Sequence, residues 1–348
     1  MGNTATRPGR NEESDVADAV RSDDQAAFAE LANRYRPELQ VHCYRMLGSF
    51  EDSEDQVQET FLRAWRKRDT FQGRSTFRAW LYRIATNACL DLIARRQRDP
   101  AVPAGGPAAK NGGGAPSEVP WLQPYPDHLL DLVAPDDSTP DASVVAKETI
   151  ELAFLATIQH LTAKQRAALI LCDVLGSPAS EAASLLDASI ASVNSALQRA
   201  RATLRERLPA RRLEWAPARD ATEQERALLR RYMDVSEHAD VAALVELLSD
   251  DARLTMPPLP HVFQGRQVII DFIGPVFEPG SPQYIGQWRR IPTRANRQPA
   301  VAAYTKLPHE PVYRARLLDV LRVEDNRIVE ITTFAPHLFP AFNLPETI

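Results

Sequence analysis

The chain has 348 residues, of which 44% are hydrophobic and 25% are charged, and its formal net charge is −5. This length predicts two or three domains, and the composition excludes disordered and fibrous classes. No run of about 18 apolar residues occurs, so we expect no membrane span, and the first residues lack the apolar centre of a signal peptide. Three widely separated cysteines predict a reducing cytosol and neither a disulfide framework nor a zinc site.

Charge is distributed unevenly along the chain. Asn11 to Thr60 contains thirteen acidic residues and four arginines, whereas Phe61 to Arg98 contains ten basic and two acidic residues. Arg199 to Arg212 adds six arginines and one glutamate. Blocks of opposite charge indicate separate surfaces for separate partners, although solvated helix faces produce the same pattern.

Helical patterns fill residues from about 23 to 98, and a different composition follows them. Residues 99–141 hold nine prolines and five glycines, which predicts a linker that does not fold alone. Within it lies one aromatic segment, Trp121-Leu122-Gln123-Pro124-Tyr125-Pro126-Asp127. Aromatic side chains in a linker favour docking, so Trp121 and Tyr125 are the docking candidates.

The third part of the chain, from about 142 to 208, is helical again, and the period changes after Thr222. Two helices near 223–238 and 240–248 and another near 266–272 are predicted there. Extended segments are predicted at 252–256, 300–307, 313–323 and 327–334. Helices followed by antiparallel strands indicate an α+β domain.

Two surfaces are predicted on the first helical part. Asp52, Asp55, Gln56 and Glu59 fall at helical spacing and share one face, while an apolar stripe from Val57 to Trp65 follows on another. Further along, an apolar stripe from Trp80 to Leu92 predicts core. Tyr82, Arg83, Thr86 and Asn87 fall on a different face, where Arg and Asn side chains suit phosphates and base edges and aromatics suit unpaired bases. Arg95 and Arg96 add charge for a DNA backbone.

The second helical part predicts a helix-turn-helix. Thr162 is a candidate N-cap, and the break Asp187-Ala188-Ser189 separates two helices. The second helix, from about Ile190 to Leu208, would enter the major groove by its N-terminal end. Its apolar stripe is Ile190, Val193, Leu197, Ala200 and Leu204. The side chains left for DNA are Ser192, Asn194, Ser195, Gln198, Arg199 and Arg201.

Two phrases, DSEDQVQETFLRAWRK and WLYRIATNACLDLIARRQR, resemble in this order the polymerase-binding helix and the promoter −10 helix of extracytoplasmic-function (ECF) sigma factors of the sigma-70 family. SVNSALQRARATLRERL resembles the −35-reading domain of that family, although Asn194 and Ala196 stand where many relatives carry Lys and Arg. The resemblance implies that the acidic face docks on a basic coiled coil of the polymerase largest subunit, with Asp52, Asp55, Gln56, Gln58 and Glu59 in contact.

The resemblance also implies a −10 surface. The loop from about Phe71 to Thr76 would receive a flipped non-template base, and stacking in a pocket would offset the cost of opening the duplex. The −10 set is Phe71, Arg74, Ser75, Tyr82, Arg83, Thr86, Asn87, Arg95 and Arg96.

After residue 222 the order of elements resembles the SnoaL-like group of the NTF2 superfamily, in which a curved sheet wraps around helices to form a cone. Known sigma subfamilies carry such a tail together with a linker like Trp121–Pro126. Relatives of the fold include cyclases and isomerases with a His or Asp acid/base. His261, Asp271, His309 and Asp319 are the candidates here, but their spacing does not require catalysis, so a binding or regulatory role is expected.

These observations predict a multidomain chain. It has a flexible N-terminus (1–20), two all-α sigma domains, namely a sigma-2 helical bundle (21–98) and a sigma-4 helix-turn-helix domain (142–212), a Pro/Gly-rich linker between them (99–141), and a C-terminal α+β cone (222–348). The predicted function is that of a cytoplasmic alternative sigma factor. It would bind the coiled coil and flap of core RNA polymerase, recognise −35 and −10 promoter elements and promote strand opening.

The C-terminal domain is predicted to regulate this activity in cis, with room for a small ligand. No enzymatic activity, catalytic residue, cofactor, metal or membrane contact is expected. Two alternatives stay open. One is a SnoaL-like small-molecule-binding or catalytic protein tethered to a DNA-binding module. The other is a repressor that binds DNA without polymerase, but a repressor does not need the acidic face from Asp52 to Glu59.

Overall fold

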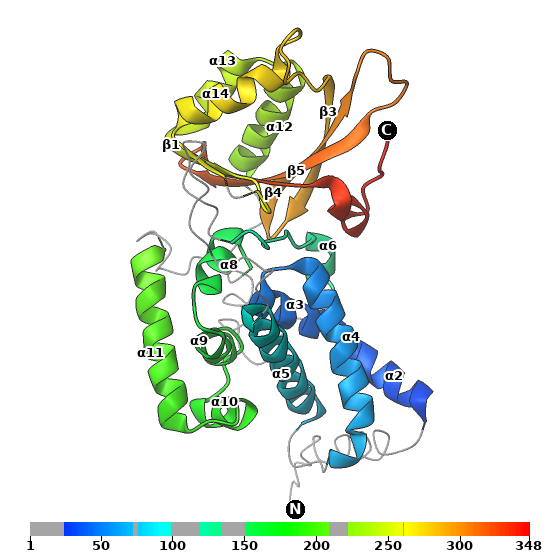
Figure 1. Ribbon diagram of the computed structural model, residues 1–348, viewed down its shortest axis with the longest axis vertical. Coiled ribbons are helices and arrows are strands. Elements are labelled where there is room, and N and C mark those ends of the chain that lie inside the picture. Colours follow the sequence, from blue (N-terminus) through cyan, green and yellow to red (C-terminus); the bar gives the residue numbers. More distant parts are fainter. Residues whose placement is uncertain (1–23, 72–75, 99–118, 134–149, 209–221, 260) are drawn as a thin grey trace, which may run out of the picture. The chain divides into compact units, whose positions relative to one another are not determined.

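The computed structural model describes residues 24–71, 76–98, 119–133, 150–208, 222–259 and 261–348 (Figure 1). These residues form two compact units. The first contains the described residues of 24–98, 132–133 and 157–208, and the second contains those of 119–131, 150–156 and 222–348. No described helix has the length and apolar character that crossing a bilayer requires.

The first unit begins with a helical bundle. Its helices are α2 (Gln25–Arg34), α3 (Arg36–Leu47), α4 (Phe50–Arg66) and α5 (Phe77–Arg98), with a short 3-10 turn η1 (Arg68–Thr70) after α4. Helix α3 lies at the centre, because its residues from Leu39 to Leu47 are all buried. It ends at Gly48, whose φ of 72° is left-handed, and Ser49 then caps α4 by accepting a hydrogen bond from the Asp52 amide.

Aromatic rings close one end of this bundle. Phe77, the first residue of α5, packs on four of these rings. Its ring centroid lies 6.2 Å from that of Phe28 and 5.6 Å from those of Tyr35, Phe71 and Trp80. Phe71 is therefore a core residue of the bundle in this structure. Such ring pairs add stabilisation beyond the area that they bury.

The rest of the first unit is built on α9 (Ala163–Leu169), a π-helical turn η2 (Ile170–Val174), α10 (Ala179–Leu185) and α11 (Ile190–Arg207), which follow α8 (Leu152–Gln159). Thr162 and Gln165 form a capping box at the start of α9. Helices α10 and α11 are separated by a tight turn in which Asp187 has a φ of 49°. Apolar residues from Ala168 to Val193 form the core between these helices, which is the geometry of a helix-turn-helix.

One buried cation ties α9 to the bundle. The Arg166 guanidinium donates to the carbonyl oxygens of Ile158, Gln159 and Met46, near the C-terminal ends of α8 and α3. Carbonyls in the last turn of a helix lack intrahelical donors, so the buried guanidinium supplies hydrogen bonds there. Burial lowers the pKa of Arg166 to about 10.

The second unit is an α+β domain, as predicted. Its helices are α12 (Glu223–Glu237), α13 (Val241–Leu247) and α14 (Arg266–Phe277). Its strands are β1 (Leu248–Thr255), β2 (Val262–Gln264), β3 (Gln287–Ala295), β4 (Gln298–Lys306), β5 (Arg314–Glu324) and β6 (Arg327–Phe334). They form one sheet in the order β2-β1-β6-β5-β4-β3. The three helices cover one face of it, and the apolar core lies between (Figure 1).

The sheet corrects two expectations. The sequence predicted antiparallel strands, but β1 and β6 pair in parallel, so the sheet is mixed. Strand β3 was also not predicted. It contains three arginines and a proline, yet it buries Trp288 and Arg290 on the helix-covered face. On the other face, Tyr304 packs on Phe339 of the 3-10 segment η4 (Pro336–Phe342).

Candidate nucleic-acid and polymerase interface

The predicted polymerase-binding residues lie on different sides of α4. Asp55 and Gln58 are exposed. Gln56 is buried, because α4 turns Ser53, Gln56, Val57, Thr60 and Ala64 towards the bundle. Asp52 accepts two hydrogen bonds from Arg96 of α5, at 2.6 and 2.7 Å, and Glu59 pairs with Arg63 at 2.7 Å. The structure thus separates the predicted set into surface, core and ion-paired residues.

The exposed side of α4 is a stripe at spacings of three, four and seven residues. We call it the α4 stripe, and its members are Glu51, Glu54, Asp55, Gln58 and Leu62. Leu62, at the C-terminal end of the stripe, is 52% exposed. Partial burial, and then the charges of Asp55 and Glu51, raise the pKa of Glu54. Sequence reasoning missed Leu62, although it stands four residues after Gln58.

The predicted −10 residues on α5 also fall into two groups, one exposed and one buried or ion-paired. Arg83, Asn87 and Arg95 are exposed and follow one another at helical spacing, whereas Arg96 is the partner of Asp52. Tyr82 and Thr86 are buried. The Tyr82 hydroxyl donates to Glu38 at 3.2 Å, and the Thr86 hydroxyl donates to the Tyr82 carbonyl at 2.7 Å. Arg74 and Ser75 lie outside the described residues.

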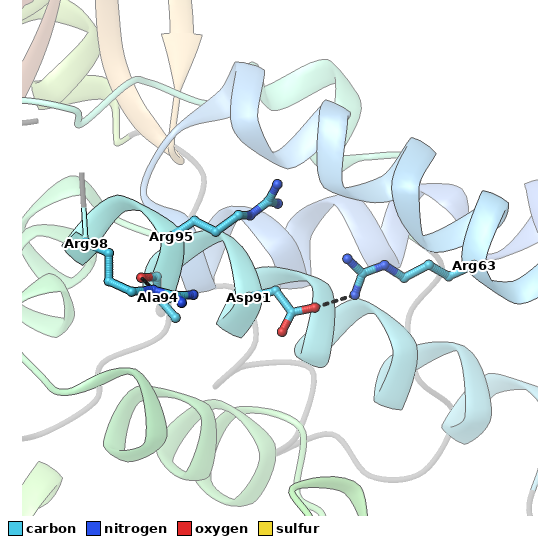
Figure 2. Close-up of a pocket in the computed structure, with 5 residues that line it drawn as sticks. All are labelled: Arg63, Asp91, Ala94, Arg95 and Arg98. Atoms are coloured by element: carbon cyan, nitrogen blue, oxygen red, sulfur yellow. Dashed lines mark hydrogen bonds and ion pairs between the residues drawn. The ribbon is translucent and has the colours of Figure 1, made fainter. Parts of the chain in front are cut away.

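A basic pocket lies where α4 and α5 run side by side (Figure 2). Its volume is about 320 Å³, and it is lined by Arg63, Asp91, Ala94, Arg95 and Arg98. Arg63 donates to Asp91 at 2.6 Å, and Figure 2 shows these two side chains pointing towards each other. Three guanidinium groups against one carboxylate give the pocket a positive charge, which suits a phosphate.

The predicted −35 residues lie on α11. Ser192, Asn194, Gln198 and Arg199 are exposed. Arg199 bends back to donate to the Ser195 hydroxyl at 2.7 Å. Arg201 makes two hydrogen bonds to Asp173, at 2.9 and 2.6 Å, so it joins α11 to η2.

The apolar stripe of α11 needs one correction. Val193, Leu197, Ala200 and Leu204 are buried as predicted, but Ile190 is 50% exposed. It is the first residue of the helix and lies one residue beyond the packed turn.

Within the second unit, the linker segment lies against the turn between β3 and β4. That turn is formed by Asn296 and Arg297, whose φ values of 57° and 59° are left-handed. The Tyr125 amide donates to the Asn296 side-chain oxygen at 2.8 Å, and the Asn296 amide donates to the Tyr125 carbonyl at 2.9 Å. Tyr125 is fully buried, and Trp121 is half-buried.

Asp127 strengthens this contact at the start of the short helix α6 (Asp127–Leu130). Its carboxylate accepts a hydrogen bond from the Arg297 amide at 2.8 Å and pairs with Arg294 at 3.1 Å. Burial raises the pKa of Asp127, while the Arg297 hydrogen bond opposes that shift.

The four acid/base candidates of the C-terminal domain lie in different environments. Asp271 and His309 are exposed, and His261 is half-buried beside Phe263. Asp319 is buried, and both of its oxygens are used: one accepts from Tyr232 at 2.9 Å and Arg290 at 3.0 Å, the other from Thr333 at 2.7 Å. Within the described part of the chain, no three His, Cys, Asp or Glu side chains are grouped to hold a metal.

Comparison with known proteins finds matches to three protein-family models along the chain. Residues 31–99 match sigma-70 region 2, residues 151–204 match sigma-70 region 4, and residues 229–331 match the SnoaL-like domain. The ECF RNA polymerase sigma factor SigG of Mycobacterium tuberculosis (strain H37Rv) is 40% identical over 338 residues, which cover 95% of this chain and 86% of SigG. SigW of Bacillus subtilis (strain 168) is 31% identical over 189 residues, 54% of this chain and 92% of SigW.

Among solved structures, the ECF sigma factor SigJ of Mycobacterium tuberculosis covers 91% of this chain and 99% of its own with a TM-score of 0.56. At 23% identity this match supports the fold. The predicted resemblance and fold class are confirmed. The chain therefore belongs to the ECF sigma factors of RNA polymerase and carries a SnoaL-like domain at its C-terminus.

Proposed function

We propose that this sigma factor binds core polymerase through the α4 stripe and reads promoter DNA through α5 and α11. We also propose that its own C-terminal domain inhibits initiation. The α4 stripe supports the first part. It presents three carboxylates followed along the helix by one exposed leucine, which suits a partner surface with basic side chains and an adjoining apolar contact, such as a basic coiled coil of the polymerase largest subunit. The flap is the corresponding partner proposed for region 4.

The proposed promoter-binding surfaces consist of side chains of α5 and α11 that are exposed in the folded protein. For the −10 element these are Arg83, Asn87 and Arg95, with the pocket beside Arg63 available for a backbone phosphate. For the −35 element they are Ser192, Asn194, Gln198 and Arg199 on α11. Strand opening is assigned to the loop after Phe71, most of which lies outside the described residues.

The observation that carries cis regulation is the double role of Asn296. Its side-chain oxygen binds the Tyr125 amide, and its side-chain nitrogen donates to the Ile150 carbonyl at 2.7 Å. Next to it, the Gln298 side chain accepts a hydrogen bond from the Leu152 amide at 3.0 Å. We call these contacts the linker clamp.

The linker clamp joins two points of the segment that connects region 2 to region 4. Holding Tyr125 and Ile150 at one turn closes the chain between them into a loop and shortens the span available to the two DNA-reading regions. A sigma factor that must reach the −10 and −35 elements together is restrained by such a loop. The C-terminal domain would in this way do the work of a separate inhibitory protein.

The experiment is run-off transcription with core polymerase and full-length protein. Asn296→Gly removes both side-chain contacts while the left-handed turn stays accessible to glycine. We expect it to raise the initiation rate severalfold. Asn326→Gly, at the left-handed turn between β5 and β6, is the matched control and should leave the rate unchanged. An unchanged or lower rate with Asn296→Gly would contradict inhibition by the linker clamp. Truncation before Thr222 removes Asn296 and Gln298 together and should also raise the initiation rate.

A small-molecule role for the C-terminal domain is the second candidate. Two buried donors on β3, Trp288 Nε1 and Arg290 Nε, have no acceptor among the described residues. A ligand oxygen would satisfy them. Asp319 is a poor candidate for a catalytic base, because its buried carboxylate is held by three hydrogen bonds, one of them from the Arg290 guanidinium, which disfavours uptake of a proton. Stabilisation of the full chain against heat by a small ligand, with loss of the effect in Trp288→Phe, would support this role.

A further inference from the structure

The start of α11 exposes an apolar side chain where the helix meets DNA in the proposed function. Ser189 caps the helix, because its hydroxyl oxygen accepts a hydrogen bond from the Ser192 amide at 3.1 Å. Ile190 follows as the first helical residue and is half-exposed, whereas the buried stripe begins only at Val193. The core of the helix-turn-helix therefore does not account for an isoleucine at this position.

The neighbours of Ile190 are small or uncharged. Ala191, Ser192 and Asn194 are exposed, and the first basic side chains of the helix, Arg199 and Arg201, come two turns later. Arg199 and Arg201 are in addition bound to Ser195 and Asp173. The N-terminal end of α11 thus offers the groove apolar surface and short polar groups rather than cations.

The major groove displays one apolar group, which is the 5-methyl group of thymine. The second helix of a helix-turn-helix enters that groove by its N-terminal end, where Ile190 stands. We propose that Ile190 packs against a thymine methyl of the −35 element and so selects thymine at that position. This inference rests on the proposed function, since it requires α11 to be the reading helix.

Exposure by itself does not carry the proposal, because single exposed apolar residues are common on protein surfaces. Val268 of α14 is an example, with a side chain exposed to a similar extent in the second unit, for which no DNA contact is predicted. What distinguishes Ile190 is its place at the first position of the reading helix, beside a capping serine that orients this end. Val268 therefore supplies the matched control.

The test uses holoenzyme assembled from core polymerase and the full chain. A −35 element is first selected from duplexes randomised at that position. Each thymine of the selected element is then replaced by deoxyuridine, one at a time, which removes only the 5-methyl group. Binding affinity is compared for wild type, Ile190→Ser and Val268→Ser, and thermal unfolding followed by circular dichroism checks that both variants fold.

We expect wild-type holoenzyme to lose about fourfold in affinity at one thymine, the effect of uncovering one methyl group. Ile190→Ser should bind the thymine and deoxyuridine duplexes equally, and Val268→Ser should keep the fourfold loss. The inference is overturned if the selected element has no thymine, if wild type is indifferent to every replacement, or if Ile190→Ser keeps the loss. If holoenzyme enriches no duplex above core polymerase alone, the proposed function fails, and this inference fails with it.

Discussion

The two units of this protein place their charged groups differently. The first unit keeps the ion pairs Asp52–Arg96 and Arg63–Asp91 partly exposed, and its buried Arg166 is bound to carbonyl oxygens instead of a carboxylate. The second unit buries a complete ion pair, since the Arg290 and Asp319 side chains are 3% and 5% exposed. Surface pairs open at little cost, whereas a buried pair that loses one partner leaves an uncompensated charge.

This difference assigns distinct tasks to the two units. In the proposed function, arginines and carboxylates of α4 and α5 leave one another to bind DNA or polymerase, because water replaces the lost partner. The Arg290–Asp319 pair, with Tyr232 and Thr333 around it, fixes the interior of the sheet instead. A domain that holds a linker in one position needs such a fixed interior.

The largest expected effect comes from breaking the buried pair. Asp319→Ala leaves the Arg290 guanidinium buried without its carboxylate, and the free energy of unfolding should fall by about 3–5 kcal/mol. Urea denaturation of the full chain measures it. The double change Arg290→Met with Asp319→Leu should recover much of the loss, and a double variant as unstable as Asp319→Ala would show that packing, not charge, controls the effect.

The next effect is a pH dependence of the first unit. Burial, and then the charges of Arg45 and Arg78, lower the pKa of His42 from 6.5 to about 3. Since the unfolded chain takes up the proton first, stability is complete above pH 6.5 and is lost as the pH falls towards 3. The loss between pH 7 and pH 4 should be about 3 kcal/mol from this residue. Acid unfolding of wild type and His42→Gln measures it, and equal slopes for the two would contradict the account.

A smaller effect of opposite sign is expected for the linker. Because burial raises the folded-state pKa of Asp127 above the ordinary value of 3.8, the folded chain takes up this proton first. The resulting stabilisation is present at acid pH and is lost as the pH rises through the raised pKa. Asp127→Asn should remove this pH dependence of the linker clamp. The protection factor of the Asn296 amide between pH 4 and pH 7, which is corrected for the intrinsic rise of exchange with pH, follows it. A protection factor that rises with pH in wild type would contradict the sign.

The smallest effect concerns the surface pair. Asp52→Asn should lower the free energy of unfolding by less than about 1 kcal/mol, because Arg96 becomes hydrated when its partner is lost. The same change frees Arg96, so DNA binding by the holoenzyme should become tighter and more dependent on salt. Affinity for DNA, measured across a salt series, checks this result. If Asp52 had only a structural role, the DNA affinity would fall together with the free energy of unfolding.

Sequence periodicity was sufficient for the helices, the helix-turn-helix and the buried residues Val193 and Leu197, because these depend on local spacing. It was not sufficient for Gln56, Tyr82 and Thr86, whose burial depends on which neighbouring helix faces them. Strand β3 was not predicted because Arg290 faces inwards, and the residue that pairs with it, Asp319, is distant in sequence. The parallel pairing of β1 with β6 and the contact of Tyr125 with Asn296 likewise depend on residues far apart along the chain.

The central claim, that the α4 stripe brings this protein to core polymerase for promoter-specific initiation, is tested most directly by run-off transcription with wild type, Asp55→Lys and Asp271→Lys. Asp271 is an exposed carboxylate of α14 and controls for the change in charge. We predict that wild type and Asp271→Lys initiate from a promoter that core polymerase ignores, while Asp55→Lys loses about tenfold or more. Equal activity of the two variants, or no initiation by wild type, would contradict the claim.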